Sequence, residues 1–324
     1  MSRPWILASA LALAVVVACL AALALPTQAA VRARNAFLLR RGRSGDFAWT
    51  PETAPPDFRI ERDEAPRAIA EAARASGAAE VTDDWHRALA LVGMLIGGQA
   101  NEGAIHADLV TTFHGIRAGR GYCTDYVRVY MAAARTAGLF CRQWAFSFDG
   151  FGGHGHTFVE VYDQQRAAWA FIDVQNNVYA VFAGDDAPLS ALVLREALLA
   201  SPSRIEFRRA APGRLGFPHP EKLLDYYRRG AAEWYLWWGN DVITRERTGI
   251  AGILRTLSGR LAHRVSALGG LPPFKVLATP DNESAIERME RLRRWATALG
   301  LIGLGLGLAL ALQWGWPLIA RRLG

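Results

Sequence analysis

Three side chains that can do nucleophilic chemistry together lie in order along one stretch of the sequence: Cys123, His156 and Asp173. A cysteine attacks a carbonyl carbon as the thiolate, whereas a free thiol has a pKa near about 8.5. A neighbouring histidine can take the thiol proton, and a carboxylate can hold the imidazole in one tautomer and stabilise the imidazolium. These residue types therefore predict a Cys-His-Asp triad for acyl transfer.

The segments around the three residues predict a helix followed by an antiparallel meander. Apolar residues recur at helical spacing over residues 124–137, so a helix is expected to begin directly after Cys123. Strands are expected at 141–148, 157–162 and 168–174. His156 would open one strand and Asp173 would close the next, which brings the two side by side. The helix start would stabilise a thiolate, and the Cys123 N–H there can donate to an oxyanion.

Two aromatic residues are candidates for substrate binding. Tyr122 directly precedes the candidate nucleophile, and Trp144 lies in the strand expected at 141–148. Both are expected to line the cleft, with packing in the core as the alternative for each. Cys141, at the start of the same strand, is expected to belong to the core.

A second histidine, two residues away, is an alternative base. His154 lies in a glycine-rich loop, whereas His156 is followed by an alternating strand that contains Glu160. We therefore expect His156 to be the base. A zinc site of Cys123, His154 and His156 is another alternative, but it lacks a fourth spaced ligand. No metal and no cofactor are expected.

The composition indicates a folded protein. The 324 residues are 51% hydrophobic and 21% charged, which suits a globular chain with a sizeable core. The net charge of +7 is carried almost wholly by arginine, since lysine occurs only at Lys222 and Lys275. No basic stripe interleaved with aromatic residues occurs, so nucleic acid is not an expected partner. The three cysteines cannot build a disulfide framework.

Both ends of the chain contain long apolar runs. Residues 5–25 carry no charge and match the ~20 residues of one bilayer span. Thr27-Gln28-Ala29 resembles a signal-peptide cleavage site, but the length of the run favours an uncleaved signal anchor. Residues 295–320 are also uncharged and have tryptophans near both ends, which predicts a second transmembrane helix.

Two signals disagree about which side of the membrane the middle of the chain faces: the arginines beside the two spans and the signal-like start. An outward-facing middle leaves three of them in the cytosol: Arg3, Arg321 and Arg322. An inward-facing middle leaves nine there: Arg32, Arg34, Arg40, Arg41, Arg43, Arg288, Arg291, Arg293 and Arg294. The positive-inside rule favours a cytosolic domain, whereas the signal-like start favours the opposite side. We predict a domain outside the cytoplasm.

The sequence divides into six segments. They are a signal anchor (1–29), a linker (30–64), a catalytic core (65–183), a helical, aromatic-rich extension (184–283), a charged juxtamembrane helix (284–294) and a transmembrane helix (295–320). Within the extension a helix is expected over 220–238. Its aromatic residues, from Tyr226 to Trp238, suit a core, a membrane interface or a bound sugar or peptide chain.

Together the central motifs resemble the transglutaminase-like superfamily of papain-like cysteine enzymes. They are Gly121-Tyr122-Cys123, Ala137-Gly138-Leu139-Phe140-Cys141-Arg142, His156-Thr157-Phe158-Val159-Glu160, and Trp169 followed by Asp173. The resemblance covers residues 85–180 and implies an α+β, papain-like core, in which the helix that carries the cysteine packs on an antiparallel sheet. Two positions depart from the family pattern: Phe158 stands where tryptophan is usual, and Val174 where proline is frequent.

The resemblance implies acyl transfer through a thioester, as in a protease, amidase or transamidase. We predict a membrane-anchored cysteine enzyme that acts on a protein or peptide, with hydrolysis favoured over transfer to an amine. Its other expected partners are the lipid bilayer and proteins of cell-envelope assembly. The alternative is a non-catalytic scaffold that binds a peptide during envelope or polysaccharide assembly.

Overall fold

The computed structural model describes residues 3–22, 27–96, 103–105, 107–214, 216–217, 219–247 and 270–323. The chain forms two compact units. The globular unit comprises residues 38–149 and 154–282, and the terminal unit comprises residues 1–37, 150–153 and 283–324. The globular unit is mixed α+β, as predicted, and contains the three candidate triad residues.

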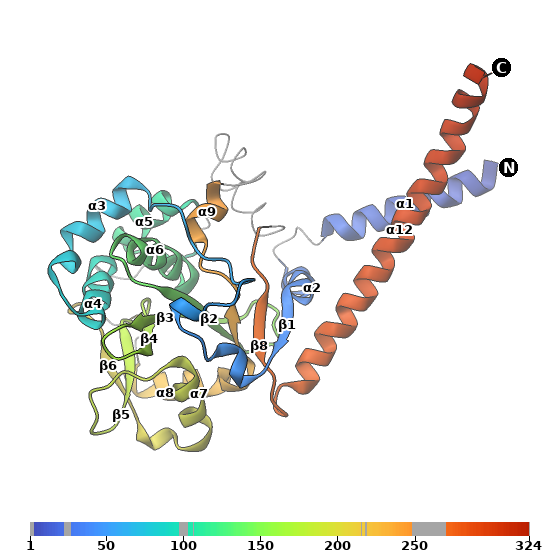
Figure 1. Cartoon of the computed structure of the whole chain (residues 1–324). Coiled ribbons are helices and arrows are strands. Elements are labelled where there is room, and N and C mark those ends of the chain that lie inside the picture. Colours follow the sequence, from blue (N-terminus) through green and yellow to red (C-terminus); the bar gives the residue numbers. More distant parts are fainter. Residues whose placement is uncertain are drawn as a thin grey trace. The chain divides into compact units, whose positions relative to one another are not determined.

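An eight-stranded sheet lies at the centre of the globular unit (Figure 1). Its order is β1-β8-β7-β2-β3-β4-β5-β6. The strands are β1 (Leu39–Gly42), β2 (Cys141–Ser147), β3 (Gly155–Asp163), β4 (Ala168–Asp173), β5 (Val178–Phe182), β6 (Ile205–Arg209), β7 (Trp234–Trp237) and β8 (Phe274–Leu277). All neighbours are antiparallel except β1 and β8, which are parallel. The strands expected to carry the site, β2 to β4, therefore lie in the middle of the sheet.

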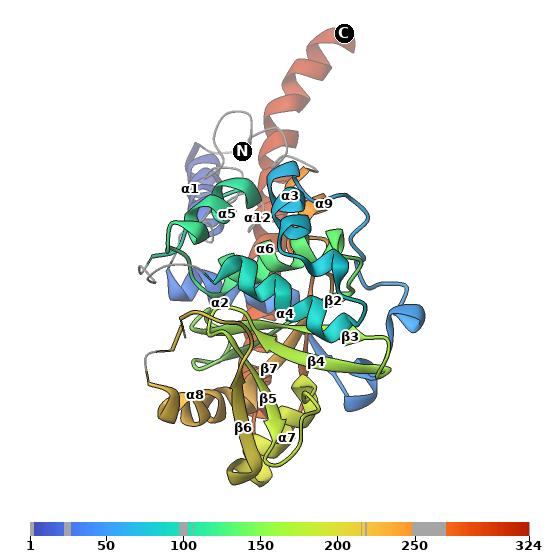
Figure 2. The same ribbon diagram turned by 90° about the vertical axis from the view of Figure 1, so that its left-hand side faces the viewer.

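Four helices cover one face of this sheet (Figure 2). They are α3 (Arg67–Ala75), α4 (Asp84–Leu95), α5 (Leu109–Arg117) and α6 (Cys123–Thr136). Their apolar residues form one core with Val159 and Val161 of β3 and Ile172 of β4, and α9 (Val242–Arg247) adds to it. The Asp83 side chain caps α4 by accepting the N–H of His86 at 2.9 Å.

The opposite face of the sheet is covered by α7 (Ala191–Ala200) and α8 (Leu223–Gly230) over an aromatic core (Figure 2). This core includes Trp144, Phe146, Phe158, Phe171, Tyr227 and Trp234. Because successive strand residues point to opposite faces, Phe158 faces the aromatic core while Val159 faces α6. His156 and Glu160 lie two residues either side of Phe158, so they share its face.

The elements around the candidate site form where the sequence predicts them. The helix expected over 124–137 is α6, which begins at Cys123 itself and ends at Thr136. The strands expected at 141–148, 157–162 and 168–174 are β2, β3 and β4. The strands β2, β3 and β4 are buried on both faces, against the helices on one side and the aromatic core on the other, and α6 is buried over most of its length.

The single helix expected over 220–238 is wrong. Residues 220–222 and 231–233 form 3-10 turns, α8 ends at Gly230, and β7 covers Trp234–Trp237. Along β7, buried Trp234 and Leu236 alternate with half-buried neighbours, which is the period of a strand. The extension 184–283 is therefore not simply helical, because it adds β6, β7 and β8 to the sheet. Residues 248–269 of the extension lie outside the residues that the structure describes.

The stretch 30–64, expected to be a linker, is largely part of the fold. It contains β1 and two short 3-10 helices, at 44–47 and 51–53. Phe47, Trp49 and Phe58 are buried in the aromatic core. Large aromatic side chains gain much by burial, and this outweighs the prolines that made the segment look irregular.

The terminal unit contains α1 (Arg3–Ala22), α2 (Gln28–Leu38, up to residue 37), the loop 150–153 and α12 (Glu283–Leu323). Among the described residues, one helical segment is long and apolar enough to cross a membrane: Glu283–Leu312 of α12, whose most apolar stretch of 18 residues has a mean hydropathy of 2.0. In α1 the described residues contain a shorter apolar segment, Ser9–Cys19. The described residues therefore give one candidate membrane helix, at the C-terminal end, and not one at each end as predicted.

Within the terminal unit, α1 packs against α12. A Cβ atom on Gly303 would lie 2.4 Å from Cγ1 of Val16, and one on Gly307 would lie 3.8 Å from Leu13. Glycine at residue 303 therefore permits the close approach of the two helices. The charged helix and the apolar helix predicted at this end form one continuous helix.

Candidate active site

Cys123 is the first residue of α6, and the chain turns sharply just before it. Gly121 has a φ of 107°, in the left-handed region that favours glycine. The Asp125 carboxylate accepts hydrogen bonds from the N–H groups of Tyr122 at 3.0 Å and Ile105 at 3.1 Å. These bonds hold the chain where the helix begins, and so fix the position of the thiol.

His156 and Asp173 come from adjacent antiparallel strands, near the start of β3 and at the end of β4. Nε2 of His156 lies 2.5 Å from Oδ2 of Asp173. Their side chains are 3% and 0% exposed. Because Nε2 faces the carboxylate, Nδ1 is the ring nitrogen left for Cys123.

The Cys123 thiol is half-buried and interacts with two groups at the start of β3. Burial raises the pKa of the thiol. The charge of His156, a hydrogen bond with its ring and the backbone N–H of Thr157 together outweigh burial, so the pKa of Cys123 is lowered overall. A lowered thiol pKa is what a cysteine nucleophile needs near neutral pH.

The pKa of His156 moves in the opposite direction. Burial lowers it, but the charges of Asp173 and Cys123 and the hydrogen bonds to both raise the pKa of His156 to about 10. Burial raises the pKa of Asp173, but the charge of the imidazolium and the hydrogen bonds donated to the carboxylate lower it by more, so the pKa of Asp173 is lowered overall. The arrangement therefore favours a thiolate, an imidazolium and a carboxylate in a row, which titrate as a coupled set.

Asp173 also accepts hydrogen bonds from two residues that were not predicted as part of the site. Asn176 donates its backbone N–H to Oδ1 at 3.0 Å and its side-chain amide to Oδ2 at 2.7 Å. The Tyr227 hydroxyl donates to Oδ2 as well. Asp173 and Asn176 are three residues apart, a spacing typical of a turn in which an aspartate accepts a nearby backbone N–H. This local pattern could have revealed the contact with Asn176. Nothing in the local sequence links Asp173 to Tyr227, 54 residues later.

A second buried charge cluster lies on the same face of β3. Glu160 accepts hydrogen bonds from Nε of Arg142 at 2.6 Å, from Nε1 of Trp144 and from the N–H of Ala191 at 2.5 Å. The guanidinium of Arg142 lies 3.9 Å from the ring centroid of Trp169. The motif residues Arg142, Glu160 and Trp169 thus join β2, β3, β4 and α7 beneath the site.

The other predicted site residues occupy different environments. Tyr122 is 49% exposed beside Cys123 and remains a candidate for substrate contact. The placement of Trp144 in the cleft is wrong, because its side chain is 0% exposed and lies in the core. His154 is exposed, and no interaction joins it to Cys123 within the described residues. In the same part of the chain, no three His, Cys, Asp or Glu side chains gather as metal ligands would.

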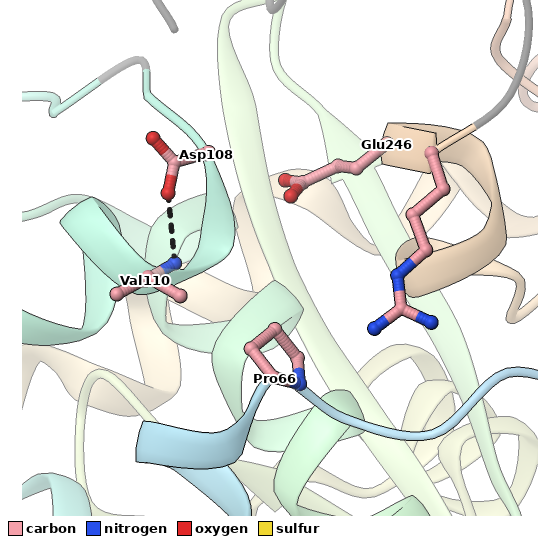
Figure 3. A pocket seen from close by; sticks show the side chains of 5 residues that line it. Pro66, Asp108, Val110 and Glu246 are labelled. Atoms are coloured by element: carbon pink, nitrogen blue, oxygen red, sulfur yellow. Dashed lines mark hydrogen bonds between the residues drawn. The ribbon is translucent and has the colours of Figure 1, made fainter. Parts of the chain in front are cut away.

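A cavity of about 410 Å³ lies away from the triad, between α3, α5 and α9 (Figure 3). It is lined by Pro66, Asp108, Val110, Glu246 and Arg247. Its carboxylates already have protein partners: Asp108 caps α5, and Glu246 accepts from Arg128 and from the N–H of Leu109. Burial raises the pKa of Glu246, but the group serves to join the two helix ends.

Comparison with known proteins shows a similarity only at the level of a family, over part of the chain. No curated protein and no solved structure matches the chain. One family model does match, and its superfamily consists largely of cysteine acyl-transfer enzymes, with some non-catalytic members. Residues 99–174, which include Cys123, His156 and Asp173, match the model of the transglutaminase-like superfamily.

Proposed function

We propose that this chain is a transglutaminase-like cysteine enzyme that transfers acyl groups from amide bonds. Cys123 is the nucleophile, His156 the general base and acid, and Asp173 the group that orients and stabilises the imidazolium. One observation carries this proposal: His156 interacts with Cys123 on one side and with Oδ2 of Asp173, 2.5 Å away, on the other.

In the first step, Sγ of Cys123 forms a bond to the carbonyl carbon of the substrate. The C–N bond then breaks, and the leaving amine takes the proton of the His156 imidazolium, which leaves a thioester and a neutral imidazole. The backbone N–H of Cys123 is the proposed donor to the oxyanion, because the first N–H groups of a helix have no acceptor within it.

In the second step, water attacks the thioester and neutral His156 takes a proton from it. The C–S bond breaks, the acid product leaves, and the thiolate–imidazolium pair forms again. We propose hydrolysis rather than transfer to an amine because water is the abundant acceptor.

The proposed substrate is a protein or peptide at a membrane. The apolar segment of α12 supports attachment to a bilayer. We further propose that the globular unit lies outside the cytoplasm, where proteins of envelope assembly are its partners.

Alkylation of the full-length chain in detergent tests the reactive thiol. At pH 7, iodoacetamide should modify Cys123 about tenfold or more faster than Cys141 in the unfolded chain, because only the thiolate reacts. Cys141 is buried in the folded chain, and burial raises its pKa, so folded Cys141 should stay unmodified. His156→Ala should slow the labelling of Cys123 at least about tenfold. Labelling of Cys123 no faster than that of unfolded Cys141 would refute the proposal.

Turnover separates an enzyme from a scaffold. Hydrolysis of p-nitrophenyl acetate should show a burst of nitrophenolate as Cys123 is acylated, followed by steady release as the thioester hydrolyses. Cys123→Ser should lose both phases and keep the fold. A reactive Cys123 that releases a single equivalent and then stops would favour the non-catalytic scaffold.

A further inference from the structure

The hydroxyl of Tyr227 reaches the triad from outside the segment that matches the family model. It donates to Oδ2 of Asp173, the same oxygen that faces Nε2 of His156. Tyr227 lies on α8, which packs directly on the sheet: a Cβ atom on Gly230 would lie 2.2 Å from Cδ2 of Phe146. A glycine at the end of α8 thus permits the approach that brings the hydroxyl to the carboxylate.

The ring of Tyr227 is completely buried, and other aromatic rings surround it. Its neighbours are Phe146, Phe158, Phe171 and Phe207, with ring centroids 5.1 to 6.4 Å away. A phenylalanine would satisfy these contacts equally well, so the hydroxyl is not needed for packing. Burial and the charge of Asp173 raise the pKa of Tyr227 well above its usual value, which keeps the hydroxyl protonated and able to donate.

Asp173 needs such a donor because its side chain is 0% exposed. A buried carboxylate is costly unless it is paired or hydrogen-bonded. In the proposed reaction His156 alternates between imidazolium and neutral imidazole, and in the neutral stage the carboxylate has no cation beside it. The donors that remain with full effect are the two groups of Asn176 and the hydroxyl of Tyr227.

We propose that Tyr227 is a positioning residue, whose hydroxyl keeps Asp173 ionised and directed at His156 while the imidazole gives up and regains its proton. This role requires the triad chemistry proposed for Cys123. Removal of the hydroxyl destabilises the state with neutral His156 more than the state with the imidazolium, because in the latter the imidazolium still compensates the carboxylate. Hydrolysis of the thioester, which needs neutral imidazole, should therefore slow. Attack by the thiolate, which begins from the imidazolium state, should change little.

The test is the pH dependence of p-nitrophenyl acetate hydrolysis by the full-length Tyr227→Phe variant. The steady rate should fall about tenfold, and the burst rate should stay within about twofold of the unmodified chain. The pH at which the steady rate reaches half its maximum should rise by about 0.5 to 1, because a stronger base needs a higher pH to become neutral. Asn176→Ala removes another donor to the same oxygen and should move the midpoint in the same direction.

Tyr162→Phe is the matched control, since Tyr162 is a buried tyrosine of the same aromatic core that makes no hydrogen bond to Asp173. It should leave both rates and the midpoint unchanged. If Tyr227→Phe lowers only the melting temperature, with the same midpoint and the same ratio of burst to steady rate, Tyr227 merely packs and the inference is wrong. If Tyr227→Phe fails to fold, an unchanged midpoint in Asn176→Ala overturns it. Absence of the burst in the unmodified chain would instead refute the proposed function.

Discussion

Two buried carboxylates, one on β3 and one at the end of β4, face the same aromatic core, and they differ mainly in the cation beside them. Glu160 has arginine as its partner, with Nε of Arg142 at 2.6 Å. Asp173 has histidine, with Nε2 of His156 at 2.5 Å. Both carboxylates are 0% exposed, and both accept additional hydrogen bonds from side chains and backbone.

The choice of cation separates stability from chemistry. Arginine stays protonated at every physiological pH, so the pair of Arg142 and Glu160 cannot exchange a proton and acts as a fixed anchor. Histidine can exchange one, and His156 also contacts a thiol that is half-buried. We therefore expect changes at Glu160 to act chiefly on folding and changes at Asp173 to act chiefly on the reaction.

The largest effect is expected from Asp173→Asn. Acyl transfer should fall by about 100- to 10,000-fold, because a neutral amide cannot stabilise the imidazolium or hold its tautomer. The pKa of His156 should move down toward its usual value. Steady-state hydrolysis of p-nitrophenyl acetate measures the loss, with unfolding in urea as the check on stability. Activity within threefold of the unmodified chain would show that Asp173 has no part in the reaction.

Glu160→Ala should lower the free energy of unfolding by about 3 to 5 kcal/mol, because it leaves the buried guanidinium of Arg142 without its partner. Activity per folded molecule should remain within about threefold, since Glu160 does not contact the triad. Unfolding in urea measures the free energy of unfolding, and active-site titration measures the activity per folded molecule. The double variant Arg142→Met, Glu160→Met should recover part of the lost stability, and equal losses in the single and double variants would contradict this account.

The pH dependence of stability should also differ between the two pairs. His156 has its pKa raised from 6.5 to about 10, so the folded chain holds a proton that the unfolded chain releases in that range. The resulting stabilisation is complete below about pH 6.5 and is lost as the pH rises through about 10. The pKa of Cys123 is shifted in the opposite direction, so the proton that its thiol loses on folding offsets the one that His156 keeps. The comparison is therefore made without the thiol: the free energy of unfolding should fall across this window more steeply in Cys123→Ser than in the double variant Cys123→Ser, His156→Gln. Adding Glu160→Ala to Cys123→Ser should keep the steep slope, and parallel curves for the first two variants would contradict the assignment.

The smallest effect is expected from Glu71→Ala. Nε of Arg67 lies 2.6 Å from Oε1 of Glu71, the same separation as between Arg142 and Glu160, but these side chains are 89% and 54% exposed. Solvent screens an exposed pair, so the free energy of unfolding should change by less than about 0.5 kcal/mol. A loss comparable to that of Glu160→Ala would mean that burial is not what distinguishes the two pairs.

The core of the site was predictable because local patterns define it. Cys123 at a helix start, and His156 and Asp173 on consecutive strands, follow from helical and strand periods and from the pairing of adjacent strands. Trp144 was misplaced because alternation shows that a strand has two faces without showing that both of them are covered, as they are in β2. Tyr227 was assigned to a long helix because tyrosine and tryptophan at positions 226–238 suit a helix or a strand.

The amino-acid sequence alone was sufficient to indicate the positions of the candidate triad residues, the mixed α+β core and an apolar C-terminal helix, because each rests on residues close together in the chain. The hydrogen-bond partners of the candidate triad depend on the packing of distant segments. Tyr227 meets Asp173 only because α8 lies on the aromatic face of the sheet, where Gly230 permits contact with Phe146. Trp49, from a segment that looked like a linker, is buried against Trp169 for the same reason. Such contacts arise from the burial of large apolar faces, which no short pattern of residues specifies.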